Sequence, residues 1–203
     1  MPTPMIVGVG GFCSNVGKTT LMCDLLELLP GWEAIKTTKG HYRSCGKTAH
    51  TCCVSHLLSD EPTVYSGRQQ TYECGKDTGR YWDAGAANVH WVIATEQQIG
   101  AGINMALQHV STPGVLIEGN SFSQHVNVHF LIMVTDGKSP MKKSARTVLP
   151  RCKALYISSP PENNQGIWML DLPDLPGVPI FHKPDLQLLV KQIRNAGVLA
   201  RIL

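Results

Sequence analysis

Continuous apolar runs alternate with stretches of helical periodicity along most of the chain. The apolar runs predict buried strands at residues 5–10, 33–38, 90–95, 114–119, 128–136, 153–159 and 177–181. Apolar residues at helical spacing predict helices at 18–29, 77–88, 96–110 and 184 to about 195. Because fully apolar strands that alternate with helices are typical of a parallel sheet covered on both faces, we predict an α/β fold.

Residues 40–76 depart from this pattern. They show no clear periodicity and are rich in His, Cys, Gly and Ser, so we interpret them as a functional loop with one short helix at 52–58. The chain has 203 residues, 43% of them hydrophobic, which is enough to bury one α/β core. We therefore expect a single domain over residues 1–203, with a Cys- and His-rich loop at about 40–76.

Ligands of parallel α/β sheets bind beyond the carboxyl ends of the strands. Four residues suited to ligand binding stand at or just beyond predicted strand ends, namely Gly11, Lys36, Glu118 and Asp136. The sequence therefore predicts that these residues gather at one edge of the sheet.

A glycine-rich segment, "GFCSNVGKTT", joins the first predicted strand to the first predicted helix. Phosphate-binding loops usually have four residues between the first glycine and Gly-Lys-Ser/Thr, whereas five separate Gly11 from Gly17 here. Backbone N–H groups of such a loop cradle phosphates, Lys18 reaches the β- and γ-phosphates, and Thr19 offers its hydroxyl to Mg²⁺. The predicted nucleotide-binding residues of the loop are Gly11, Ser14, Asn15, Val16, Gly17, Lys18, Thr19 and Thr20.

The longer spacing resembles the loop of dethiobiotin synthetase and its relatives in the SIMIBI class of P-loop NTPases. The segments "IKTTKG" and "VLIEG" are similar to two further motifs of that class, a lysine after the second strand and an acidic residue before a glycine. The resemblance implies a Mg²⁺ site formed by Thr19 and Glu118. A carboxylate at the end of a buried strand also needs a partner, and Mg²⁺ or a Mg²⁺-bound water supplies one.

A second resemblance covers most of the chain. The segment "GKDTGRYWDAGA" resembles the Gly-Lys-Asp-Ser…Ala-Gly-Ala motif of the molybdopterin-guanine dinucleotide biosynthesis adapter, the MobB family, and "GVLIEGNSF" and "GVPIFHKPDLQLLVKQI" are similar to its later segments. The resemblance implies a homodimer that binds GTP, hydrolyses it weakly and assists a nucleotidyltransferase. In place of the family's His-rich segment after the second strand, this chain has "TTKGHYRSCGKTAHTCC".

We expect Lys18, Lys36 and Lys76 to be the catalytic residues. Lys18 would neutralise phosphate charge, and Lys36 or Lys76 would aid transfer or sense the γ-phosphate. The segment "ISSPPENN" follows a strand near the expected base, so Asn163 is a candidate for base contact. GTP and ATP are both candidates for the bound nucleotide.

Four cysteines, Cys45, Cys52, Cys53 and Cys74, lie within thirty residues, with three histidines interleaved. Thiolates and imidazoles suit Zn²⁺ or a [4Fe–4S] cluster, but the spacing is not that of a zinc ribbon or a ferredoxin. The alternative is four unrelated cysteines in a loop. A metal site here would favour a metal- or cluster-handling ATPase that serves metalloenzyme maturation.

Two further functions stay open. One is a dethiobiotin-synthetase-like, ATP-dependent ligase, which requires a closed substrate pocket beside Lys36 and no metal at the cysteines. The other is a nucleotide-binding module that holds a partner in shape without turnover. Purified protein with stoichiometric metal would favour the metal-handling function, and metal-free protein the adapter.

Net charge and the length of the apolar runs bear on two classes of partner, nucleic acids and membranes. A net charge of +3 and a pI near 8.5 give no case for nucleic acid. No apolar run reaches about 18 residues, so we expect no membrane span. The N-terminal segment lacks the features of a signal peptide, and the seven cysteines are an odd number, so we expect a cytoplasmic protein with reduced thiols.

Overall fold

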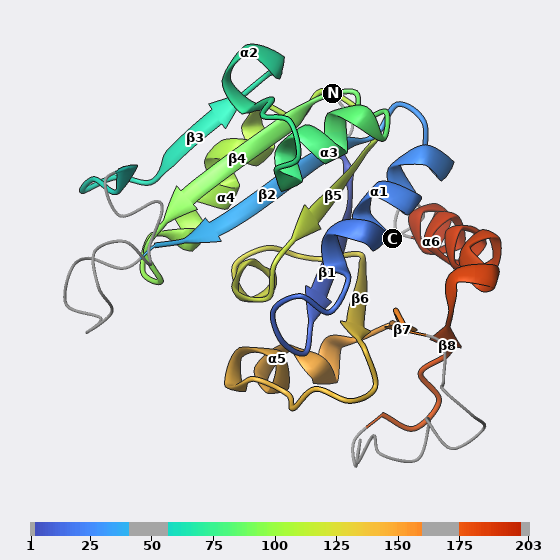
Figure 1. The fold of residues 1–203 in the computed structure, drawn as a ribbon. Helices are drawn as coiled ribbons and strands as arrows, with labels where there is room; N and C mark the ends of the chain where they lie inside the picture. The colour runs from blue at the N-terminus through green and yellow to red at the C-terminus, as the bar shows by residue number, and fades with distance from the viewer. Residues whose placement is uncertain (1–2, 41–56, 160–174, 200–203) are drawn as a thin grey trace.

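One eight-stranded sheet organises the molecule (Figure 1). The computed structural model describes residues 3–40, 57–159 and 175–199. The strands lie in the order β3-β4-β2-β5-β1-β6-β7-β8, and every neighbouring pair is parallel except β3 and β4. The strands are β1 (Met5–Gly11), β2 (Glu33–Lys39), β3 (Thr63–Ser66), β4 (Val89–Ala94), β5 (Gly114–Glu118), β6 (Phe130–Thr135), β7 (Ala154–Ile157) and β8 (Ile180–Phe181).

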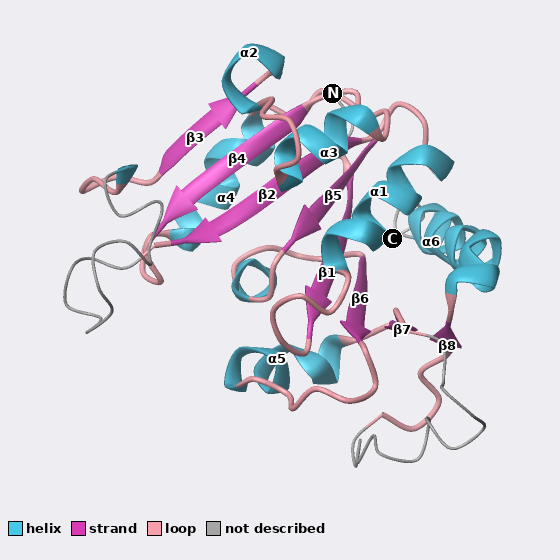
Figure 2. Cartoon of the chain, in the orientation of Figure 1, coloured by secondary structure: helices cyan, strands magenta, loops and turns pink. Residues whose placement is uncertain are grey.

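Helices cover both faces of this sheet, as the sequence predicted (Figure 2). One face carries α1, α3 and α6, and the other carries α4 and α5. The helices are α1 (Lys18–Leu28), α2 (Arg68–Thr71), α3 (Asp77–Asp83), α4 (Ile99–Gln108), α5 (Lys143–Val148) and α6 (Leu186–Leu199), with 3-10 turns η3 (Ser121–Gln124), η4 (Leu149–Arg151) and η6 (Lys183–Asp185).

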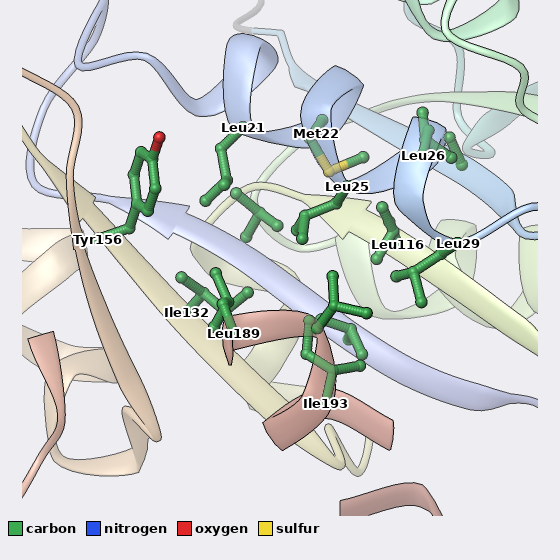
Figure 3. Packing of buried hydrophobic residues seen from close by; sticks show 14 of the residues in the cluster. Leu21, Met22, Leu25, Leu26, Leu29, Leu116, Ile132, Tyr156, Leu189 and Ile193 are labelled. Carbon is green, nitrogen blue, oxygen red and sulfur yellow. The ribbon is translucent and has the colours of Figure 1, made fainter. Parts of the chain in front are cut away.

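The largest core cluster lies between the sheet and the helices α1 and α6 (Figure 3). Leu21 and Leu25 of α1 are fully buried against Leu116 of β5 and Ile132 of β6. Full burial of one leucine stabilises the fold by about 1.5–3 kcal/mol, so this cluster fixes α1, and with it the loop that precedes α1, firmly on the sheet.

The structure differs from the sequence interpretation within residues 57–76. Part of the predicted loop forms the edge strand β3, which pairs antiparallel with β4, and the short helix α2. All four residues of β3 are only half-buried, so the strand lacks the apolar run that marked the inner strands. The helix expected at 52–58 falls almost wholly outside the described residues.

The helix predicted at 77–88 ends early, at Asp83. Gly85 has φ +88°, a left-handed conformation that favours glycine and ends a helix, and its N–H donates to the carbonyl of Trp82. The segment His182–Asp185 forms a helix cap: the backbone N–H of His182 donates to Asp185 Oδ2 at 2.9 Å, and Pro184 lies in the first turn.

A glycine in α3 is required by close packing. A Cβ atom on Gly79 would lie 2.0 Å from the carbonyl oxygen of Glu73. Replacing Gly79 by alanine should therefore displace α3 and destabilise the protein by about 1–3 kcal/mol, measured by urea unfolding. Asp83→Ala, at an exposed position of the same helix, is the control. Equal stability of the two variants would show that the packing is not as tight as described.

Candidate functional site

The loop between β1 and α1 has the backbone conformation that phosphate binding needs. Asn15 and Gly17 have φ of +63° and +89°, and Gly17 is the N-cap of α1. A Cβ on Gly17 would lie 2.8 Å from the Cβ of Ser158, so only glycine fits there. Successive backbone N–H groups in such a turn form a concave site for anions.

Gly11, which precedes the usual position of the first glycine of a phosphate loop by one residue, is in close contact with Lys18. A Cβ on Gly11 would lie 2.8 Å from Cδ of Lys18, so glycine leaves room for the lysine stem to cross the end of β1. The N–H of Gly11 donates to Asn120 Oδ1 at 2.8 Å, and Asn120 Nδ2 donates to the Gly11 carbonyl at 2.9 Å. Asn120 was not predicted, although it directly follows the Glu-Gly motif.

Lys18 is the first residue of α1, and its Nζ reaches back over the loop and donates to the carbonyl oxygen of Cys13 at 3.1 Å. Burial lowers the pKa of Lys18, and the Glu118 carboxylate offsets only part of that shift. A phosphate would supply the negative charge that this half-buried ammonium lacks. A second lysine, Lys142, lies in the segment that follows β6, and its Nζ donates to Ser14 Oγ at 2.7 Å. The sequence analysis did not predict this contact.

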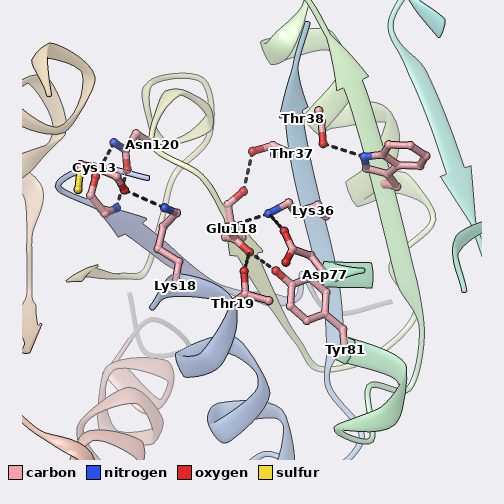
Figure 4. A network of polar contacts seen from close by, with 12 residues as sticks. Cys13, Lys18, Thr19, Lys36, Thr37, Thr38, Asp77, Tyr81, Glu118 and Asn120 are labelled. Carbon is pink, nitrogen blue, oxygen red and sulfur yellow. Dashed lines mark hydrogen bonds and ion pairs between the residues drawn. The ribbon is translucent and has the colours of Figure 1, made fainter. Parts of the chain in front are cut away.

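Glu118 is the hub of a polar network at the end of β5 (Figure 4). This buried carboxylate accepts from Thr19 Oγ1 at 3.2 Å and from Lys36 Nζ at 2.8 Å. It also accepts from the hydroxyl of Tyr81. The predicted pair Thr19 and Glu118 therefore lies together, with two oxygen atoms side by side as a Mg²⁺ site requires.

Lys36 bridges two carboxylates. Its Nζ lies 2.5 Å from Asp77 Oδ2 and 2.8 Å from Glu118 Oε1. Burial alone would lower the pKa of Lys36, but Glu118 and Asp77 outweigh it and hold the pKa above its ordinary value. Likewise burial would raise the pKa of Asp77, but the bond from Lys36 holds it below. Lys36 and Asp77 are therefore both charged at neutral pH.

The start of α3 contributes side chains to the same site. Asp77 is not the N-cap of α3, which is Lys76, and its carboxylate faces Lys36 instead. Arg80 Nη2 donates to Thr20 Oγ1 at 3.4 Å. Burial raises the pKa of Tyr81 well above its ordinary value, and the Glu118 charge adds to the shift, so Tyr81 is a neutral donor. Sequence reasoning missed Tyr81 because an aromatic residue in a helix is usually part of the core.

These groups surround a hollow of about 510 Å³. Most of the predicted phosphate-loop residues line it, together with Lys36 and Glu118, whereas Val16 is buried and Gly11 lies beneath Lys18. Lys76 lines a neighbouring hollow instead. Asn163 lies outside the described residues. The lining residues are Ser14, Asn15, Gly17, Lys18, Thr19, Thr20, Lys36, Thr37, Asp77, Arg80, Glu118 and Gly119.

Two other predictions concern Asp136, expected at the edge of the sheet with the ligand-binding residues, and the four clustered cysteines. Asp136 binds within its own turn, where it accepts from the backbone of Lys138 and Ser139, and it does not line the hollow. Cys74 is exposed, while Cys45, Cys52 and Cys53 lie outside the described residues. In the part of the chain that the structure describes, no three His, Cys, Asp or Glu side chains are placed to share a metal ion.

The fold and the loop define a class. A parallel sheet with a Gly-Lys-Thr loop between β1 and α1, and an acidic residue at the end of the neighbouring β5, is the P-loop NTPase fold. Among residues 3–40, 57–159 and 175–199, no helix has the length and apolarity that a membrane crossing demands.

Comparisons with known proteins give no more specific assignment than this class. No protein-family model and no curated protein matches the chain. A solved structure of LpxK from Aquifex aeolicus in complex with ATP matches with a TM-score of 0.49 and 18% identity, over 90% of this chain and 54% of LpxK. The chain thus spans about half the length of that protein. The likeness concerns the arrangement of the fold.

Proposed function

We propose that the protein binds one nucleoside triphosphate with Mg²⁺ at this hollow and hydrolyses it slowly. The observation that carries the proposal is the convergence of the phosphate loop, Thr19 and Glu118 around a single polar hollow. The half-buried ammonium of Lys18 adds a cation where the β- and γ-phosphates would lie.

The residues present fit a Mg²⁺ ion. Thr19 Oγ1 and Glu118 Oε2 lie 3.2 Å apart, and hydroxyl and carboxylate oxygens are ligands that Mg²⁺ uses. When bound, the ion would neutralise phosphate charge. Thr19 and Glu118 would hold it, Lys18 and the loop N–H groups would bind the phosphates, and Tyr81 would keep the Glu118 carboxylate oriented.

Slow hydrolysis follows from the charge pattern. Lys36 is already paired with Asp77 and Glu118, so it offers the γ-phosphate less free positive charge than an unpaired lysine would. Lys18 and Arg80 are the other cations that line the hollow, and the guanidinium of Arg80 donates to Thr20 Oγ1. Stimulation by a partner or a second ligand that frees Lys36 from Asp77 is therefore expected.

We further propose a GTP-binding role like that of the MobB adapter. Two of the three segments that carry this resemblance, "GKDTGRYWDAGA" and "GVLIEGNSF", are far apart in sequence but line one hollow together with the phosphate loop, through Asp77 and Arg80 of the first and Glu118 and Gly119 of the second. Spatial convergence supports a shared role for these segments. Homodimerisation and a nucleotidyltransferase partner belong to the same proposal.

The test is the Mg²⁺ dependence of phosphate release from GTP and ATP. Glu118→Gln should raise the Mg²⁺ concentration for half-maximal activity about tenfold or more, because one metal-binding charge is lost. Glu96→Gln is the matched control, since Glu96 is a largely exposed carboxylate that pairs with Lys39. Equal Mg²⁺ dependence in wild type and Glu118→Gln would contradict the proposed metal site.

A further inference from the structure

A second hollow of about 620 Å³ adjoins the phosphate-loop hollow. Lys36 and Asp77, which form the 2.5 Å ion pair, line both hollows and so stand between them. The second hollow lies on the same face of the sheet as α1 and α3, between β2, β4 and the segment that leads from α2 into α3.

The walls of this hollow are more apolar than those of the first. Trp91 of β4 stands opposite Lys36 of β2, and its Nε1 donates to Thr38 Oγ1 at 2.8 Å, which fixes the indole ring (Figure 4). Leu57 and Tyr72 complete the apolar lining, and 38% of Tyr72 is exposed. Small-molecule sites combine this kind of lining with a few polar groups and fall in the range of about 300–1,000 Å³.

Two exposed charged side chains also line the hollow, the ammonium of Lys76 and the carboxylate of Glu73, so an anionic group has to lie on the Lys76 side. Lys76 has no salt bridge with any described residue. A fixed indole, a tyrosine and an apolar leucine suit a planar ring, and an available ammonium suits an anionic substituent on that ring.

We propose that this second hollow binds a small planar organic anion, with its ring against Trp91 and Leu57 and its anionic group beside Lys76. A role of this ligand as a second substrate or activator rests on the proposed nucleotide site, whereas its binding to the hollow does not. The hollow lies beside Lys36, where the ligase-like function needs its substrate pocket, but it is open to solvent rather than closed. Lys76 lines this hollow rather than the phosphate-loop hollow.

The probe is 8-anilino-1-naphthalenesulfonate, a planar anion whose fluorescence rises on binding. We expect saturable binding of one probe per chain. Leu57→Trp, which fills the hollow from its rim, should weaken that binding about tenfold or more. Leu188→Trp is the matched control, because Leu188 is an exposed residue of α6, outside the lining of the hollow. Equal probe affinity in the two variants would overturn the proposal.

The charge preference is tested with an uncharged analogue, N-phenyl-1-naphthylamine. Lys76→Gln should weaken binding of the anion about fivefold and leave binding of the neutral analogue unchanged. Equal losses for both probes would overturn the anionic part of the proposal.

GTP and ATP binding are measured on the same samples. Nucleotide binding without hollow-dependent probe binding would overturn this inference alone. Probe binding that depends on Leu57, in protein that binds no nucleotide, would overturn the proposed function and leave the second site standing.

Discussion

Replacing Lys18 by glutamine should weaken nucleotide binding about 100-fold or more. Lys18 is the half-buried ammonium of the phosphate loop, and each charged hydrogen bond lost costs about 1.5–3 kcal/mol, so loss of two accounts for a change of this size. Glutamine keeps most of the stem that crosses Gly11, so the fold should persist. The measurement is the dissociation constant of a fluorescent GTP or ATP analogue at saturating Mg²⁺.

Lys191→Gln is the control for this variant, because Lys191 is an exposed lysine of α6 outside the loop. It should bind nucleotide as the wild type does. If Lys18→Gln retained wild-type affinity while its thermal stability was also unchanged, Lys18 would not be a phosphate ligand.

Replacing Glu33 by alanine should have the largest effect on stability. Glu33 and His90 are fully buried, with His90 Nε2 and Glu33 Oε2 2.6 Å apart. The other carboxylate oxygen accepts from the backbone N–H of Ser111 at 2.8 Å and of Thr112 at 3.1 Å. The variant leaves buried polar partners unsatisfied, which should lower the free energy of unfolding by about 3 kcal/mol or more.

This loss should depend on pH. Burial would raise the pKa of Glu33, but hydrogen bonds from His90 and Ser111 hold it below its ordinary value. Since the folded-state pKa is the lower one, the contribution is complete above the unfolded-state pKa of about 4.3 and is lost as pH falls through the folded-state pKa.

Urea unfolding at pH 7 and at several lower values measures the effect. Glu27→Ala, at an exposed glutamate of α1, is the matched control and should change stability little. A gap between Glu33→Ala and wild type that stays constant down to pH 3 would refute the charged Glu33 described here.

Several parts of the fold were predictable because their signals are local. Apolar runs marked the inner parallel strands, and glycine, lysine and threonine in one short segment marked the phosphate loop. The strand end at Glu118 could also be identified, since a carboxylate that closes an apolar run is unusual. Its contact with Thr19 follows from the parallel pairing of β1 and β5.

Other parts depend on contacts that no local pattern reveals. The edge strand β3 and the helix α5 are short and carry few buried residues, so neither has a periodicity long enough to recognise. Tyr81 and Asn120 acquire polar roles only because α3 and the segment after β5 bring them to Glu118 and Gly11. The pairing of Lys36 with Asp77 likewise depends on where α3 begins.

The most direct test of the central claim is equilibrium dialysis of the wild-type protein against radiolabelled GTP and ATP, with and without Mg²⁺. The structure predicts saturable binding of one nucleotide per chain, tighter with Mg²⁺, because one phosphate loop faces one hollow that contains Thr19 and Glu118. Absence of saturable binding of either nucleotide at millimolar concentration, in protein shown to be folded, would contradict the claim.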